Sequence, residues 1–84
     1  MIIFTKHAKE KFVILRKHKF VLNEEQVLET VKNPETVDYS RAPLFIAQRL
    51  LDKDHVLRVV CKKEDDDIKI ITFYPGRKSQ YEKK

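Results

Sequence analysis

The hydrophobic pattern of this chain changes its period near residue 36, and that change limits the fold classes that remain open. Earlier apolar residues recur at helical spacing, so that Ala8, Phe12 and Leu15 share one face of a helix. Later apolar and polar residues alternate in runs that short turn-like breaks divide. The expected strands are Thr36–Tyr39, Leu44–Leu51, His55–Lys62 and Ile68–Tyr74. Short breaks between strands predict an antiparallel meander.

The start of the chain predicts a short strand followed by a helix. The apolar residues 2–4 are expected to form the strand. Thr5 is a suitable N-cap for a helix that runs from Lys6 to about Lys19. The stripe of Ala8, Phe12 and Leu15 is its expected buried face.

A second helix is marked clearly at both ends. Asn23 is a good N-cap, and Gln26 three residues later completes a variant of the capping box. Asn33-Pro34 ends the helix. Because few residues join the two helices, we expect an antiparallel helix hairpin. The predicted fold is a two-layer α+β domain in the order β-α-α-β-β-β-β, with both helices on one face of a mainly antiparallel sheet.

The length and the charge of the chain limit its organisation and its partners. Its 84 residues allow one domain, 1–84, in which 75–84 is a basic C-terminal tail. We expect the last strand to end at Pro75-Gly76, because proline lacks a backbone N–H and glycine lets the chain turn. The net charge of +5 is concentrated at the two ends. Clustered basic charge favours a partner that bears phosphates, and an ordinary lysine-rich surface explains it equally well.

Several other classes of protein find little support in the sequence. No run of 18 or more apolar residues predicts a membrane span, and the first residues do not resemble a signal peptide. The lone Cys61 is expected to be a reduced, partly buried thiol in a cytoplasmic protein. His7 and His18 share a helix face at about 16 Å, too far apart for one metal ion. We therefore expect no metal and no cofactor, and we read His55 as a surface residue at a strand end.

Basic residues in the expected strands suggest a candidate binding face. If the helices cover one side of the sheet, Arg49 and Arg58 would point to the open side together with Lys62. Two arginines and a lysine on one face of a small sheet would make a phosphate clamp. The alternative, that these are ordinary solvated residues, carries equal weight.

Three segments together resemble a known family. They are FTKHAKEKFVILRKHKF, the NPE that ends the second helix, and VLRVVCKKEDDDIKIITFYPGRKSQY. In order and spacing they resemble the RelE/ParE-like toxin superfamily, nearest to its BrnT-like branch and related small uncharacterised domains. The resemblance covers nearly the whole chain and implies a RelE-like fold. It also implies the toxin component of a toxin–antitoxin pair. Some members of this superfamily cleave RNA, often on the ribosome, and ParE-like members act on gyrase.

Position by position, the resemblance suggests which residues form a site. His7 matches the helix opening, Arg16 matches a later basic position, and Lys11 stands where an arginine is frequent, which is a departure. Arg58 matches the arginine of a strand. The C-terminal end, where RelE-like nucleases often place basic and tyrosine side chains, is matched by Tyr74 and by the segment from Arg77 to Tyr81.

The reaction implied is metal-independent RNA cleavage by transesterification. A 2′-hydroxyl loses its proton and attacks the adjacent phosphorus, and the 5′-oxygen leaves, so a base, an acid and positive charge are needed. Arg58 and Arg77 are the candidates for charge stabilisation, and Tyr81 or His7 for proton transfer. The candidate RNA-binding residues are Lys11, Arg16, Arg49, Lys62, Tyr74 and Lys78. Tyr74 is expected to stack on a base or to orient the substrate.

The partners implied are RNA, including ribosome-bound mRNA, and an antitoxin protein that covers the basic face. Two alternatives stay open. One is a non-catalytic module that binds RNA or the ribosome through the same residues. The other is a ParE-like toxin that binds another protein.

Overall fold

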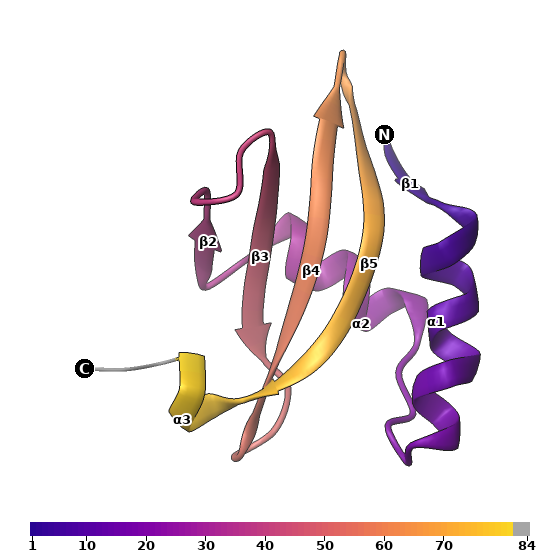
Figure 1. Cartoon of the computed structure of the whole chain (residues 1–84), viewed down its shortest axis with the longest axis vertical. Coiled ribbons are helices and arrows are strands. Elements are labelled where there is room, and N and C mark those ends of the chain that lie inside the picture. Colours follow the sequence, from indigo (N-terminus) through magenta and orange to yellow (C-terminus); the bar gives the residue numbers. More distant parts are fainter. Residues whose placement is uncertain (82–84) are drawn as a thin grey trace.

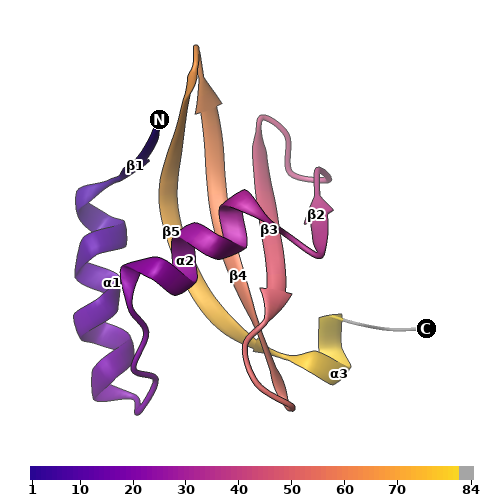
Figure 2. The same ribbon diagram turned by 180° about the vertical axis from the view of Figure 1, so that it is seen from behind.

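One mixed sheet of five strands carries two helices on one of its faces, which confirms the expected α+β class (Figures 1 and 2). The computed structural model describes residues 1–81. The elements are β1 (Ile2–Phe4), α1 (Lys6–Lys17), α2 (Glu24–Lys32), β2 (Thr36–Asp38), β3 (Leu44–Leu50), β4 (His55–Glu64), β5 (Asp67–Arg77) and α3 (Lys78–Tyr81). Residues 82–84 of the expected tail lie outside the described residues. No helix within residues 1–81 is long and apolar enough to cross a membrane.

The sheet is built around the long hairpin of β4 and β5. Its strand order is β1-β5-β4-β3-β2, and β2 to β5 form the expected antiparallel meander. The first strand joins the far edge, where it runs parallel to β5 and pairs Ile2 with Ile68. At the tip of the hairpin, Asp65 adopts a positive φ of 55°, a conformation that aspartate tolerates in turns.

The last strand continues past Pro75-Gly76, so the expected end of the strand was wrong. Pro75 pairs with Leu57, and β5 runs on to Arg77 opposite His55. The parallel partner β1 flanks β5 only at residues 68–70, so no strand of residues 1–81 lies on that side of Pro75. A proline is tolerated where its missing N–H would face an unpaired edge.

Local signals place both helix starts correctly. The Thr5 hydroxyl accepts a hydrogen bond from the Ala8 N–H, and Asn23 and Gln26 form a complete capping box. The first helix ends at Lys17, two residues early, because Lys19 turns to a φ of 68°. The helices do not form the expected antiparallel hairpin. The first lies along β5 and β1, and α2 crosses β4 and β3 obliquely (Figure 2).

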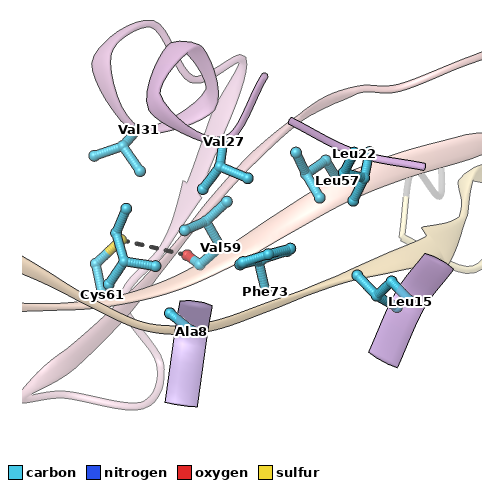
Figure 3. Packing of buried hydrophobic residues seen from close by; sticks show 10 residues of the cluster. Ala8, Leu15, Leu22, Val27, Val31, Leu57, Val59, Cys61 and Phe73 are labelled. Carbon is cyan, nitrogen blue, oxygen red and sulfur yellow. Dashed lines mark hydrogen bonds between the residues drawn. The ribbon is translucent and has the colours of Figure 1, made fainter. Parts of the chain in front are cut away.

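The core fills the layer between the helices and the sheet (Figure 3). From the expected stripe, Ala8 and Leu15 are buried, and Phe12 packs on Phe73 with ring centroids 4.6 Å apart. Cys61 is fully buried, and burial raises its pKa to about 12, so it is a structural thiol. The buried cluster is Ala8, Leu15, Leu22, Val27, Val31, Leu57, Val59, Cys61, Ile70 and Phe73.

The hydroxyl of Thr5 joins the first helix to the sheet, because it also donates to the Ile70 carbonyl at 2.8 Å. Replacing Thr5 by alanine removes both the cap and this link. We expect Thr5→Ala to lower the free energy of unfolding by about 1–2 kcal/mol in urea denaturation. Thr5→Ser keeps the hydroxyl and should retain most of the stability. Equal losses in the two variants would show that the methyl group, not the hydroxyl, matters.

Candidate functional site

The most unusual feature of the sheet is an arginine buried on the face that the helices leave open. Arg58 lies in the middle of β4 and is 8% exposed. Its Nε donates to the hydroxyl oxygen of Tyr74 at 3.1 Å, and one terminal nitrogen donates to Gln48 Oε1. The other terminal nitrogen lies 3.5 Å from a carboxylate oxygen of Asp38. A buried charge is tolerated when it is paired and hydrogen-bonded in this way.

Strand pairing brings these partners together. Arg58 lies directly opposite Gln48 on β3 and opposite Tyr74 on β5, so the three side chains stand on one face. On the edge strand, Asp38 pairs with Ile46, two residues from Gln48 on the same face. The guanidinium therefore links all four antiparallel strands at their open face.

Tyr81 covers the guanidinium from the end of the chain. Its ring lies over Arg58 with the guanidinium carbon 4.1 Å from the ring centroid, a cation–π contact. The same ring lies against Gly76, where an added Cβ would come within 2.3 Å of it. Gly76 has no positive φ, so its role is to admit the ring and not to turn the chain.

A shallow pocket of about 450 Å³ opens beside this cluster, and we call it the Arg58 pocket. The Asp38 pKa is held below its usual value, first by hydrogen bonds from Ser40 and also by Arg58, so the carboxylate is ionised at neutral pH. Hydrogen-bonding groups, two aromatic rings and two arginines share one hollow. The pocket is lined by Asp38, Ser40, Arg41, Ile46, Arg58, Tyr74, Gln80 and Tyr81.

Three of the predicted site residues meet here, namely Arg58, Tyr74 and Tyr81. Arg49 was expected on the same face, and that expectation was wrong. Arg49 pairs with the core residue Leu57 and points to the helix face, where it donates to the Asn33 carbonyl at 2.7 Å. This hydrogen bond caps the C-terminal end of α2, where Asn33 is the C-cap residue.

Lys62 is on the open face but away from the Arg58 pocket. It lies four residues along β4, roughly 13 Å from Arg58 at the rise of a strand. Its ammonium lies 3.7 Å from Glu64, which also pairs with Lys69 at 2.7 Å. This pairing lowers the Glu64 pKa and raises that of Lys69. The expectation that Lys62 joins Arg58 was wrong.

The tail does not bring Arg77 and Lys78 to Arg58 either. Arg77 pairs with His55 and therefore lies on the opposite face from Tyr74. Arg77 and Lys78 line a second pocket with Lys53, Asp54, His55 and Ser79, and we call it the His55 pocket. Of the expected C-terminal site, Tyr74 and Tyr81 reach Arg58, whereas Arg77 and Lys78 do not.

The basic residues of the first helix form no part of either pocket. His7 and Arg16 are exposed and Lys11 is half-buried on α1. Both views place α1 beside β5 and β1, away from α3 (Figures 1 and 2). No group of three or more His, Cys, Asp or Glu that would hold a metal occurs within residues 1–81.

Sequence reasoning missed the groups that complete the Arg58 pocket. Asp38, Gln48 and Arg41 were not singled out, because their proximity depends on strand register. Comparison with protein-family models, curated proteins and solved structures finds no match to this chain.

The contact between Gly76 and Tyr81 can be tested by a double-mutant cycle. We expect Gly76→Ala to lower the free energy of unfolding by about 1–3 kcal/mol, because the new methyl group collides with the ring. In a Tyr81→Ala background the same change should be neutral or slightly stabilising. Urea denaturation of the four proteins gives the coupling. Additive effects would contradict the packing of Tyr81 on Gly76.

Proposed function

We propose that this protein is a metal-independent endoribonuclease of the RelE-like type, the toxin of a toxin–antitoxin pair, and that RNA binds at the Arg58 pocket. The observation that supports this most is the arginine fixed in the sheet between a tyrosine hydroxyl and a tyrosine ring. Arginine suits a phosphate, and an aromatic ring suits a base. The fold class and the net charge of +5 agree with such a protein.

The reaction places definite demands on this pocket. The 2′-oxygen forms a bond to phosphorus while the bond from phosphorus to the 5′-oxygen breaks. The 2′-hydroxyl gives its proton to a base, and the 5′-oxygen receives one from an acid. Here Asp38 is the carboxylate available as base, Tyr74 or Tyr81 is the hydroxyl available as acid, and Arg58 and Arg41 offer positive charge to the phosphorane.

Binding of a phosphate at Arg58 requires an exchange of partners. Asp38 holds one side of the guanidinium, and its side chain is 39% exposed, so it can swing aside into water. A phosphate oxygen would then take its place. An antitoxin would act by covering this pocket, and the cytoplasm is where both proteins would meet mRNA and ribosomes.

A non-catalytic RNA-binding module is the second candidate, and one observation favours it. Three nitrogens of Arg58 already have partners, and no histidine lines its pocket. Such a site is better suited to binding an RNA strand than to transferring protons.

Cleavage of single-stranded RNA in the presence of a chelator separates the two candidates. We expect products with 2′,3′-cyclic phosphate ends, and roughly 10²-fold slower cleavage by Tyr74→Phe, which lacks the hydroxyl that Arg58 orients. An identically purified Tyr81→Ala variant controls for contaminating nucleases. Binding without cleavage, with a log–log salt slope near −0.7 per phosphate, would support the binding module instead.

The exchange of partners predicts that Asp38 weakens RNA binding. Asp38→Asn keeps the shape and the acceptor oxygen for the Ser40 N–H but removes the negative charge beside Arg58. We expect roughly two- to fivefold tighter RNA binding at low salt. Asp66→Asn, at the far tip of the β4–β5 hairpin, makes the same change in net charge and is the matched control. Equal effects of the two variants would contradict a role for Asp38.

A further inference from the structure

A histidine at the start of β4 is held in one orientation by a carboxylate. Asp52 accepts from His55 Nδ1 at 2.9 and 3.1 Å through its two oxygens. The imidazole also packs against the Phe20 ring in a T-shaped arrangement, with ring centroids 5.2 Å apart and ring planes at 80°. Hydrogen bonds from the Asp54 backbone and from His55 keep the Asp52 pKa low, so the carboxylate accepts and Nδ1 carries the proton.

The other ring nitrogen of His55 is available for a ligand. Nε2 has no hydrogen-bond partner among residues 1–81, and it points away from Asp52 because Nδ1 faces that carboxylate. Carboxylate–histidine pairs of this kind orient an imidazole for work at its far nitrogen. Sequence reasoning had assigned His55 to an ordinary surface position, since the partner three residues earlier is brought close only by the turn.

The surroundings of His55 are cationic. The His55 pocket has a volume of about 600 Å³ and is lined by Lys53, Asp54, His55, Arg77, Lys78 and Ser79. Arg77 is the direct cross-strand neighbour of His55. The Lys78 N–H donates to the Asp54 carbonyl at 2.8 Å, which fixes the start of α3 against the turn. Lys53 and Arg77 line the pocket beside His55, and the nearby carboxylate of Asp52 is engaged by His55.

We propose that the His55 pocket binds a phosphate group, held by Arg77 and Lys53 and by a hydrogen bond that the Nε2–H of His55 donates when the imidazole is protonated and Asp52 balances its charge. Guanidinium and ammonium groups are donors only, so they suit a phosphate and repel a metal ion. The Nε2–H of His55 would add a hydrogen bond to the phosphate from a third side, besides those from Arg77 and Lys53.

The phosphate belongs to the same RNA strand that enters the Arg58 pocket, a step that rests on the proposed function. The short helix α3 stands between the two pockets. Lys78 and Ser79 line the His55 pocket, and Gln80 and Tyr81 line the Arg58 pocket. An RNA strand that passes around α3 would therefore contact both pockets, although they open on opposite faces of the sheet.

The phosphate site can be tested with inorganic phosphate, observed through the imidazole NMR signals of the full chain at constant ionic strength. We expect a saturable shift of the His55 signals, with those of His7 on α1 and of His18, the residue that caps the end of α1, unchanged as internal controls. Arg77→Ala should weaken the affinity by about tenfold. Lys63→Ala, which removes an exposed lysine of β4 outside the pocket, should leave it within about twofold. A shift that does not saturate, or equal effects of the two variants, would overturn the site.

The orientation of His55 has its own test. Asp52→Ala removes a negative charge, so simple attraction predicts tighter phosphate binding, whereas loss of the fixed imidazole predicts weaker binding. We expect binding weakened by several-fold. Tighter binding would show that the pocket acts only as a patch of charge and would overturn the role of His55.

A titration with single-stranded RNA separates this proposal from the proposed function. Shifts at His55 that Arg77→Ala abolishes would support the shared strand. Phosphate binding at His55, with RNA binding that depends on Tyr81 but leaves the His55 signals unchanged, would keep the phosphate site and the proposed function and overturn the link between them. Phosphate binding at His55 with no RNA binding by the protein would overturn the proposed function as well as the link. RNA binding that depends on Tyr81, with no phosphate effect at His55, would overturn the site and leave the proposed function standing.

Discussion

The guanidinium of Arg58 is charged and almost fully removed from water on the open face of the sheet, and its partners come from every antiparallel strand and from the chain end. An uncompensated charge at this position would cost several kcal/mol. The register of the strands and the position of α3 are therefore coupled, because a slip of one residue in any pair would remove a partner. The Arg58 pocket is therefore complete only when all four strands are in register.

Features that depend on neighbouring residues could be read from the sequence. The capping groups of Thr5 and Asn23 act within three residues, and both helices begin where those signals place them. Features that depend on distant parts of the chain could not. Pro75 looked like the end of a strand, because only the tertiary arrangement reveals that β1 does not reach it.

The candidate site shows the same division more sharply. Strand pairing puts Gln48, Arg58 and Tyr74 on one face. Alternation then puts Arg49 and Arg77 on the other face, since Arg49 lies one residue from Gln48 and Arg77 lies three residues from Tyr74. Charge alone would group the three arginines on one face, whereas the alternation of the strands separates them. Tyr81 reaches Arg58 only because Gly76 leaves room for a ring, a packing relation that no spacing in the sequence indicates.

The pairing of Arg58 also bears on how a buried arginine can still bind an anion. The cost of removing its charge from water is already met within the folded protein, and Asp38 supplies the compensating charge. A phosphate that binds there would therefore replace one anion by another, and only the difference between the two would contribute to affinity. Gln48 and Tyr74 keep the guanidinium plane fixed throughout such an exchange. The same contacts that make Arg58 structural would thus make it a rigid phosphate ligand, with the exposed carboxylate of Asp38 as the part that moves.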